Sequence, residues 1–153
     1  MQKTFLNVVY GEINYNGFEF EALPIGAALL VAQQQIEQAA DQALAAVLGD
    51  PLRAIENQLA ESEAKAFKQA GYAGEVPLTV QAVVDAQGLE PIEATESILQ
   101  EAQSWHAAVC SIRAARLKGG VEVLKATTHA QAEAYADTAI NAIRASVAAV
   151  TGA

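Results

Sequence analysis

The spacing of apolar residues changes near residue 24 and divides the chain into two regions of different expected structure. The segment 13–20 alternates apolar and polar side chains on either side of Asn16-Gly17, a dipeptide strongly favoured in two-residue hairpin turns. Residues 4–10 can supply a further strand that turns at Gly11. Because an isolated hairpin is only marginally stable in water, we expect residues 1–24 to form a β-hairpin module that rests on helices or docks onto another chain.

Residues 25–153 form the second region, in which apolar side chains recur every three or four positions, the period of an α-helix with one buried face. Glycine, proline and capping residues divide this region into about five helices. The first two are separated by Gly49-Asp50 and could form an antiparallel hairpin or a bent rod. The fourth contains Gly119-Gly120, where the sequence allows either a kink or a break. The expected segments run over 27–48, from Pro51 to Gly71, from a Thr79 cap to Gly88, from Pro91 through Lys125, and onward from a capping box of Thr128 and Gln131.

Two of these helices carry stripes at alternating spacings of three and four, as coiled coils do. The stripe of the longest helix consists of Ile98, Ala102, Trp105, Val109, Ile112 and Arg116. The stripe of the last helix consists of Ala136, Ile140, Ile143, Val147 and Val150. We therefore expect a mainly α fold, with an N-terminal β-hairpin followed by about five helices in an elongated helical bundle or coiled-coil-like oligomer. Periodicity does not decide whether the seam lies within one chain or between chains.

Composition and charge narrow the possible functions. Of the 153 residues 52% are hydrophobic but only 6% are aromatic, and alanine supplies much of the hydrophobic fraction, which favours slender helices that pack closely with neighbours. The 18 acidic residues outnumber the 9 basic ones, which argues against binding to nucleic acid. The N-terminal residues lack the apolar region of a signal peptide, and no apolar run approaches the roughly 18 residues of a membrane span. We therefore expect a soluble protein made in a cytoplasm.

Few residues suggest chemistry, and no phosphate-loop, dinucleotide or zinc-protease motif is present. His106 and Cys110 are four residues apart and could form a nucleophilic pair or half of a zinc site. A zinc site needs further ligands, and His129 is the only other histidine. The apolar neighbours of Cys110, the only cysteine, predict a small buried hydrophobe. Glu93 and Glu96 are expected on a solvated first turn, so we expect no catalytic residue, no cofactor, no metal and no enzyme.

Between residues 49 and 120 the chain carries turn and packing motifs in a fixed order. They are Gly49-Asp50-Pro51-Leu52-Arg53-Ala54, Glu63 to Tyr72, Gly74-Glu75-Val76-Pro77, Thr79-Val80, Ala94-Thr95-x-x-Ile98-Leu99, Trp105 and Ile112 to Lys118. This order is similar to that of small helical proteins encoded beside tail-fibre genes in tailed bacteriophages and prophages, and related segments resemble parts of the tail fibres themselves. The resemblance covers about half of the chain.

The resemblance implies a structural component of the phage virion tail, at the fibre or baseplate, synthesised in the host bacterial cytoplasm. It would assemble with copies of itself, with a trimer favoured, and with other tail proteins. The alternatives are a tail-fibre assembly chaperone absent from the virion, a helical adaptor unrelated to phage, and a small enzyme that uses His106 and Cys110.

Interfaces are expected at the helical seam and at the aromatic side chains of the N-terminal module, because aromatic residues dominate binding hot spots. The aromatic residues could equally form the local core of the hairpin. The candidate interface residues are Phe5, Tyr10, Tyr15, Phe18, Phe20, Ile98, Trp105, Val109, Ile112, Ile140, Ile143 and Val147.

Overall fold

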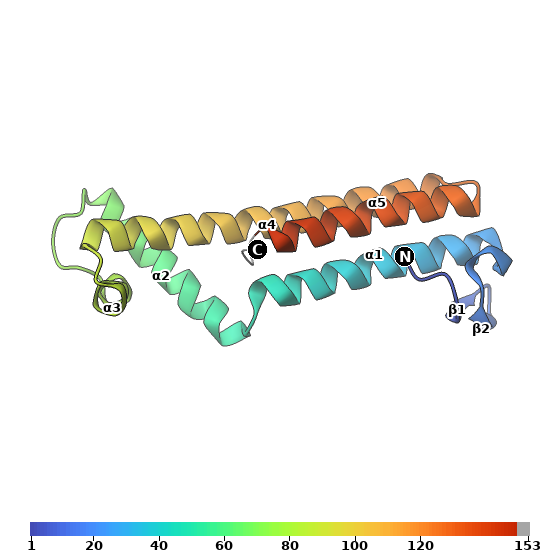
Figure 1. Ribbon diagram of the computed structural model, residues 1–153, viewed down its shortest axis with the longest axis horizontal. Coiled ribbons are helices and arrows are strands. Elements are labelled where there is room, and N and C mark those ends of the chain that lie inside the picture. The colour runs from blue at the N-terminus through green and yellow to red at the C-terminus, as the bar shows by residue number, and fades with distance from the viewer. Residues whose placement is uncertain (150–153) are drawn as a thin grey trace. The chain divides into compact units, whose positions relative to one another are not determined.

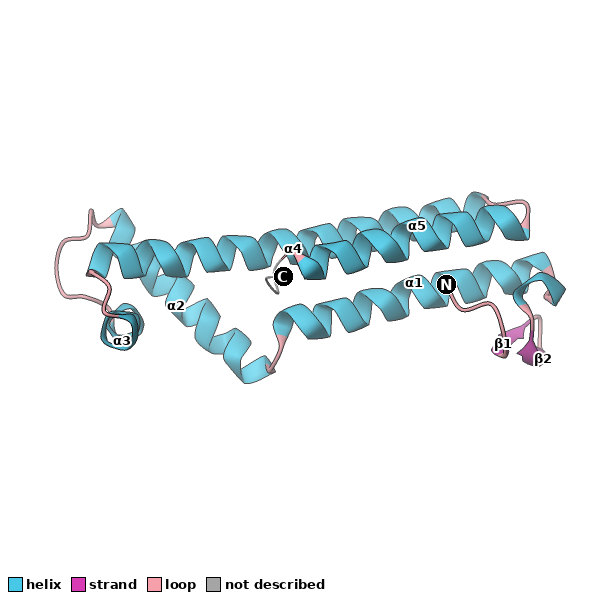
Figure 2. Ribbon diagram, viewed as in Figure 1, coloured by secondary structure: helices cyan, strands magenta, loops and turns pink. Residues whose placement is uncertain are grey.

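The computed structural model describes residues 1–149 and is mainly helical: in this part of the chain a two-stranded antiparallel sheet precedes five α-helices (Figures 1 and 2). The expected fold class is confirmed. Val150 and the end of the predicted helical region 25–153 lie outside the described residues. The chain divides into two compact units, the first made of Met1–Val47 and the residues from Ala108 onward, and the second made of Leu48–Ala107.

The hairpin of the first unit pairs β1 (Leu6–Tyr10) with β2 (Ile13–Phe18) and turns at Gly11-Glu12. Both turn residues have positive φ, 57° and 65°, as a type I′ turn requires. The prediction of a strand that turns at Gly11 is therefore confirmed, and the prediction of a turn at Asn16-Gly17 is wrong.

Asn16-Gly17 instead lies within β2 and forms a β-bulge. The pairing shifts by one residue between Leu6 and Asn7, and Gly17 adopts a φ of 73°. The Gly17 N–H donates a hydrogen bond of 3.0 Å to the Asn7 side-chain oxygen. This register leaves Leu6 and Val8 buried, so burial of the apolar face outweighs the local preference of the dipeptide for a turn.

Three helical segments form the body of the first unit: α1 (Ile25–Leu48), the part of α4 (Pro91–Lys125) that follows Ala107, and α5 (His129–Ala148). The α1 and α5 helices run in the same direction and α4 runs opposite to both (Figure 1). A short 3₁₀-helix, η1 (Phe20–Ala22), joins the hairpin to α1.

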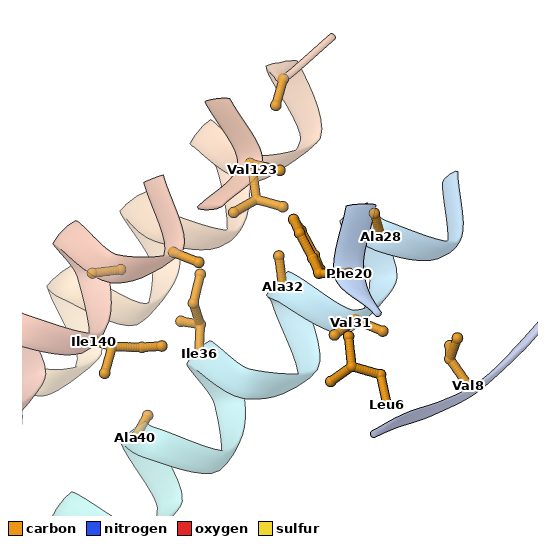
Figure 3. Close-up of a cluster of buried hydrophobic side chains, with 14 of the residues drawn as sticks. Leu6, Val8, Phe20, Ala28, Val31, Ala32, Ile36, Ala40, Val123 and Ile140 are labelled. Carbon is orange, nitrogen blue, oxygen red and sulfur yellow. The ribbon is translucent and has the colours of Figure 1, made fainter. Parts of the chain in front are cut away.

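The core of this unit gathers buried side chains from the hairpin, η1 and all three helices. Ile36 of α1, Ile140 of α5 and Val123 of α4 belong to one cluster, which Phe20 of η1 joins (Figure 3). Many of the other members are alanine, so the helices pack closely and each layer contributes little buried area.

The α4 helix continues through Gly119-Gly120 without a break. A Cβ atom on Gly119 would lie 2.4 Å from the Cβ of Ala139 and 3.2 Å from the Cδ1 of Ile36. Gly119 therefore permits the close packing of α4 against α5 and α1. A Cβ atom on Gly120 would meet nothing within 4 Å.

The second unit contains α2 (Pro51–Gln69), α3 (Leu78–Gln87) and the first part of α4, packed around Ala64, Val80 and Ala94. Asp50 caps α2 as predicted, since its carboxylate accepts a hydrogen bond of 2.9 Å from the Leu52 N–H.

Gly71 ends α2 in a Schellman motif. The N–H of Tyr72 donates to the Phe67 carbonyl, and the two aromatic rings pack edge to face 5.7 Å apart.

Thr79 does not cap α3, contrary to the prediction, because α3 begins one residue earlier with Pro77 at its N-cap position. The Thr79 N–H and hydroxyl both donate to the Glu63 carboxylate, at 3.2 and 2.6 Å. A side chain of α2 therefore supplies the cap that sequence assigned to a local residue, and it ties the two helices together.

Candidate interaction surfaces

The aromatic residues of the N-terminal module have different environments. Phe20 is fully buried, and its ring packs edge to face against His129 at 5.7 Å. Tyr15 is half-buried against the core. The ring of Phe18 packs edge to face against the ring of Tyr15, and Phe18 is the more exposed of the two. Phe5 is 77% exposed. The aromatic ring of Tyr10 covers Gly26 of α1, where an added Cβ atom would lie 2.1 Å from the tyrosine hydroxyl oxygen. Phe5 is thus the aromatic side chain of this module most available to a partner.

The predicted helical seam divides between the two cores. Ile112, Ile140 and Ile143 are buried in the first unit and Val147 packs against them, so this packing lies within one chain. Ile98 packs against the core of the second unit. The remaining two members, Trp105 and Val109, are half-buried.

A different face of α4 carries an apolar heptad stripe that is exposed along its whole length. We name this set the α4 stripe; Cys110, Ala114, Leu117, Val121 and Leu124 follow one another at spacings of four and three. Its three large members expose between 52% and 61% of their surface. In heptad terms Ala114 and Val121 occupy a positions, and the others occupy d positions. The spacing of this second series is visible in the sequence, but spacing alone does not show which of the two series the chain buries.

The charged residues that flank the α4 stripe at its e and g positions are all basic. Arg113 occupies a g position, and Lys118 and Lys125 occupy e positions. Lys125 pairs with Glu122 at 2.8 Å, but Arg113 and Lys118 form no ion pair within residues 1–149. Charged e and g positions select the partner of a heptad stripe, so this surface favours a helix with acidic flanks.

A second exposed stripe, with the same number of members, lies on α2 in the second unit. The α2 stripe consists of Leu52, Ile55, Leu59, Ser62 and Ala66, again at spacings of three and four. Its three large members expose between 54% and 70% of their surface. Glu56 flanks these three residues at an e position and makes no ion pair within the described part of the chain.

Cys110 is exposed, so the prediction of a buried hydrophobe is wrong. Its apolar neighbours suggested burial, but the face of α4 that contains Cys110 is the exposed one. His106 lies 3.4 Å from a carboxylate oxygen of Glu61. The Nε2 of His129 donates to the Leu23 carbonyl at 2.9 Å. Within residues 1–149 no three histidine, cysteine or acidic side chains are grouped to hold a metal ion.

The polar residues of the second unit form a network that connects its helices. Lys68 places its ammonium 2.7 and 2.8 Å from the two oxygens of Glu96, and the Tyr72 hydroxyl donates to the same carboxylate. These hydrogen bonds, from Lys68 first and from Tyr72 second, lower the pKa of Glu96, and the bond to Glu96 raises the pKa values of both donors.

Glu61 accepts a hydrogen bond of 2.5 Å from Lys65, which lowers the pKa of this glutamate, with a smaller contribution from His106. Each shift in the network stabilises the ordinary charged or protonated form of its group. General acid–base catalysis needs pKa values moved toward neutrality. This network is therefore suited to holding helices together.

Among the described residues, no helix combines the length and the hydropathy that crossing a membrane requires. Comparison of the chain with protein-family models, curated proteins and solved structures gave no match.

Proposed function

We propose that this chain is a structural component of a bacteriophage tail, at the fibre or baseplate, that assembles through exposed helix faces. Support for the phage assignment comes from the resemblance of residues 49–120 to small tail-region proteins. Support for assembly comes from the α4 stripe, an exposed heptad run of Cys110, Ala114, Leu117, Val121 and Leu124. Contiguous exposed apolar surface is typical of protein-binding sites.

The α4 stripe is the observation on which this proposal depends. Its side chains are too hydrophobic and too regularly spaced for a solvated helix face, and coiled-coil partners recognise this pattern. An assembly protein needs no pocket for a small molecule. A depression in the first unit, between α1 and α5, is shallow and lined mostly by alanine.

A tail-fibre assembly chaperone is the second candidate, and the α2 stripe favours it. Leu52, Ile55 and Leu59 present an amphipathic helix face that could cover a fibre surface temporarily. Both candidates predict binding to other polypeptides, but only a structural component stays in the finished particle.

Mass spectrometry of purified virions separates the two candidates. We expect peptides of this chain to copurify with the particles at a stoichiometry comparable to that of other tail proteins. Its presence in infected-cell lysate but absence from particles would favour the chaperone. Identical phage yield and particle morphology after deletion of its gene would contradict both.

A further inference from the structure

The two exposed stripes match one another in spacing when their helices run in opposite directions. Along α4 the large residues Leu117, Val121 and Leu124 are separated by four and then three positions. The large residues of α2, taken in reverse from Leu59 to Leu52, are also separated by four and then three. An antiparallel coiled coil brings a positions of one helix opposite d positions of the other. When Leu117 is placed opposite Leu59, every facing pair of the two stripes follows this rule.

The register brings large side chains opposite large ones and small opposite small. The facing pairs, α4 residue first, are Leu117 with Leu59, Val121 with Ile55, Leu124 with Leu52, Ala114 with Ser62 and Cys110 with Ala66. A parallel arrangement aligns only two large pairs, because the order of the spacings is then reversed. Three consecutive large layers make the antiparallel arrangement the better packed of the two.

Charge supports the same pairing and opposes self-pairing of the α4 stripe. The antiparallel register brings Lys118 next to Glu56, two charges without an ion-pair partner among the described residues. If two α4 stripes paired in parallel, Arg113 of one copy would face Lys118 of the other. If they paired antiparallel with Leu117 opposite Val121, the two copies of Lys118 would face each other. Like charges at these positions destabilise the pair.

We infer that the α4 stripe of one copy binds the α2 stripe of a second copy in this antiparallel register. The inference rests on the proposed self-assembly and specifies its contact. Each chain then uses its α4 stripe to bind one neighbour and its α2 stripe to bind another. Such contacts close a ring, or a dimer in which both stripes of each chain are paired, without any further binding surface. Lys65 would lie opposite Arg113 in this contact, but its ammonium is already held by Glu61 at 2.5 Å.

Cys110 provides a direct test of the register. The wild-type chain, whose only thiol is that of Cys110, is mixed under mild oxidation with the double variant Ala66→Cys/Cys110→Ser, whose only thiol is at position 66. A disulfide between positions 66 and 110 can then form only between chains. We expect this mixed disulfide in high yield, seen on a non-reducing gel and assigned by peptide mass spectrometry.

Asn57→Cys/Cys110→Ser is the matched control, because Asn57 lies on another face of α2 and is also exposed. We expect this variant to give about 10-fold less mixed disulfide. Equal yields from the two variants would overturn the inferred contact. An oligomeric wild type that forms no link between its Cys110 and the thiol introduced at position 66 would also overturn the contact but leave the proposed assembly function intact. A monomeric wild type would contradict both.

Exchange of the facing charges gives a second readout. Lys118→Glu should weaken self-association by on the order of 10-fold, and Glu56→Lys in the same chain should restore it. Both side chains lie at the surface, so circular dichroism should show unchanged helix content. Stronger association of Lys118→Glu alone would instead indicate pairing between α4 stripes and overturn the inferred contact.

Discussion

Gly119 and Gly120 are adjacent in α4 and have opposite packing environments. A methyl group at Gly119 would lie 2.4 Å from the Cβ of Ala139, whereas one at Gly120 meets open space. We predict that Gly119→Ala lowers the free energy of unfolding by about 1–3 kcal/mol through overpacking. Gly120→Ala should raise it by about 0.5–1 kcal/mol, because alanine is the better helix former. Urea denaturation followed by circular dichroism measures both, and equal effects would contradict the assigned helix contact.

Glu63 gives the second unit a pH-dependent contribution to stability. The Thr79 hydroxyl and then the Thr79 N–H lower the pKa of Glu63 below its ordinary value of 4.5. Because the folded-state pKa is the lower one, the contribution is complete above the unfolded-state value and is lost as pH falls through the folded-state value. We predict that Glu63→Gln lowers the melting temperature at pH 7 and has little effect near pH 3. Glu75→Gln, which changes an exposed loop residue, is the control, and an equal loss at both pH values would contradict the assignment.

The residues that the sequence did not place correctly depend on distant contacts. The Asn16-Gly17 turn was displaced because Leu6 and Val8 must be buried together, and the Thr79 cap was replaced because Glu63 approaches from another helix. Cap and turn preferences are local, so they succeed where no distant group competes, as at Asp50 and Gly71.

Helix α4 has two apolar faces, and its sequence period alone does not show which of them is available to a partner. Its two heptad series could not be ranked from spacing alone, and the series with Ile112 is the one that the chain buries in its own core. The series with Leu117 stays exposed because α1 and α5 pack against the opposite side of the helix in the first unit. Periodicity therefore predicted the helix and one of its apolar faces, but only the structure distinguishes the internal seam from the candidate interface.

These two faces of α4 should respond differently to truncation. We predict that Ile112→Ala lowers the free energy of unfolding by about 2–5 kcal/mol, because it leaves a cavity in the core. Leu117→Ala should leave the helix content unchanged and weaken self-association instead. Circular dichroism and sedimentation velocity separate the two effects. A loss of helix content in Leu117→Ala, or normal stability in Ile112→Ala, would mean that the faces are assigned incorrectly.

For the molecule as a whole, the composition and the exposed surfaces both support association with other polypeptides. Alanine-rich helices give thin cores with little buried area, and large apolar side chains remain exposed on α2 and α4. Association with another polypeptide covers such surfaces and adds stability that a single chain lacks. We therefore expect the melting temperature to rise with protein concentration, whereas a variant with a charged residue in the α4 stripe should melt at the same temperature at every concentration.

Sedimentation velocity of the purified chain tests this account most directly. At micromolar concentrations we expect the wild type to sediment as an oligomer, and we expect Val121→Glu and Ile55→Glu each to sediment as folded monomers, because a charge in either stripe disrupts the contact. A wild type that remains monomeric throughout the micromolar range, with a sedimentation coefficient equal to that of both variants, would contradict the claim that these helix faces bind copies of the same chain.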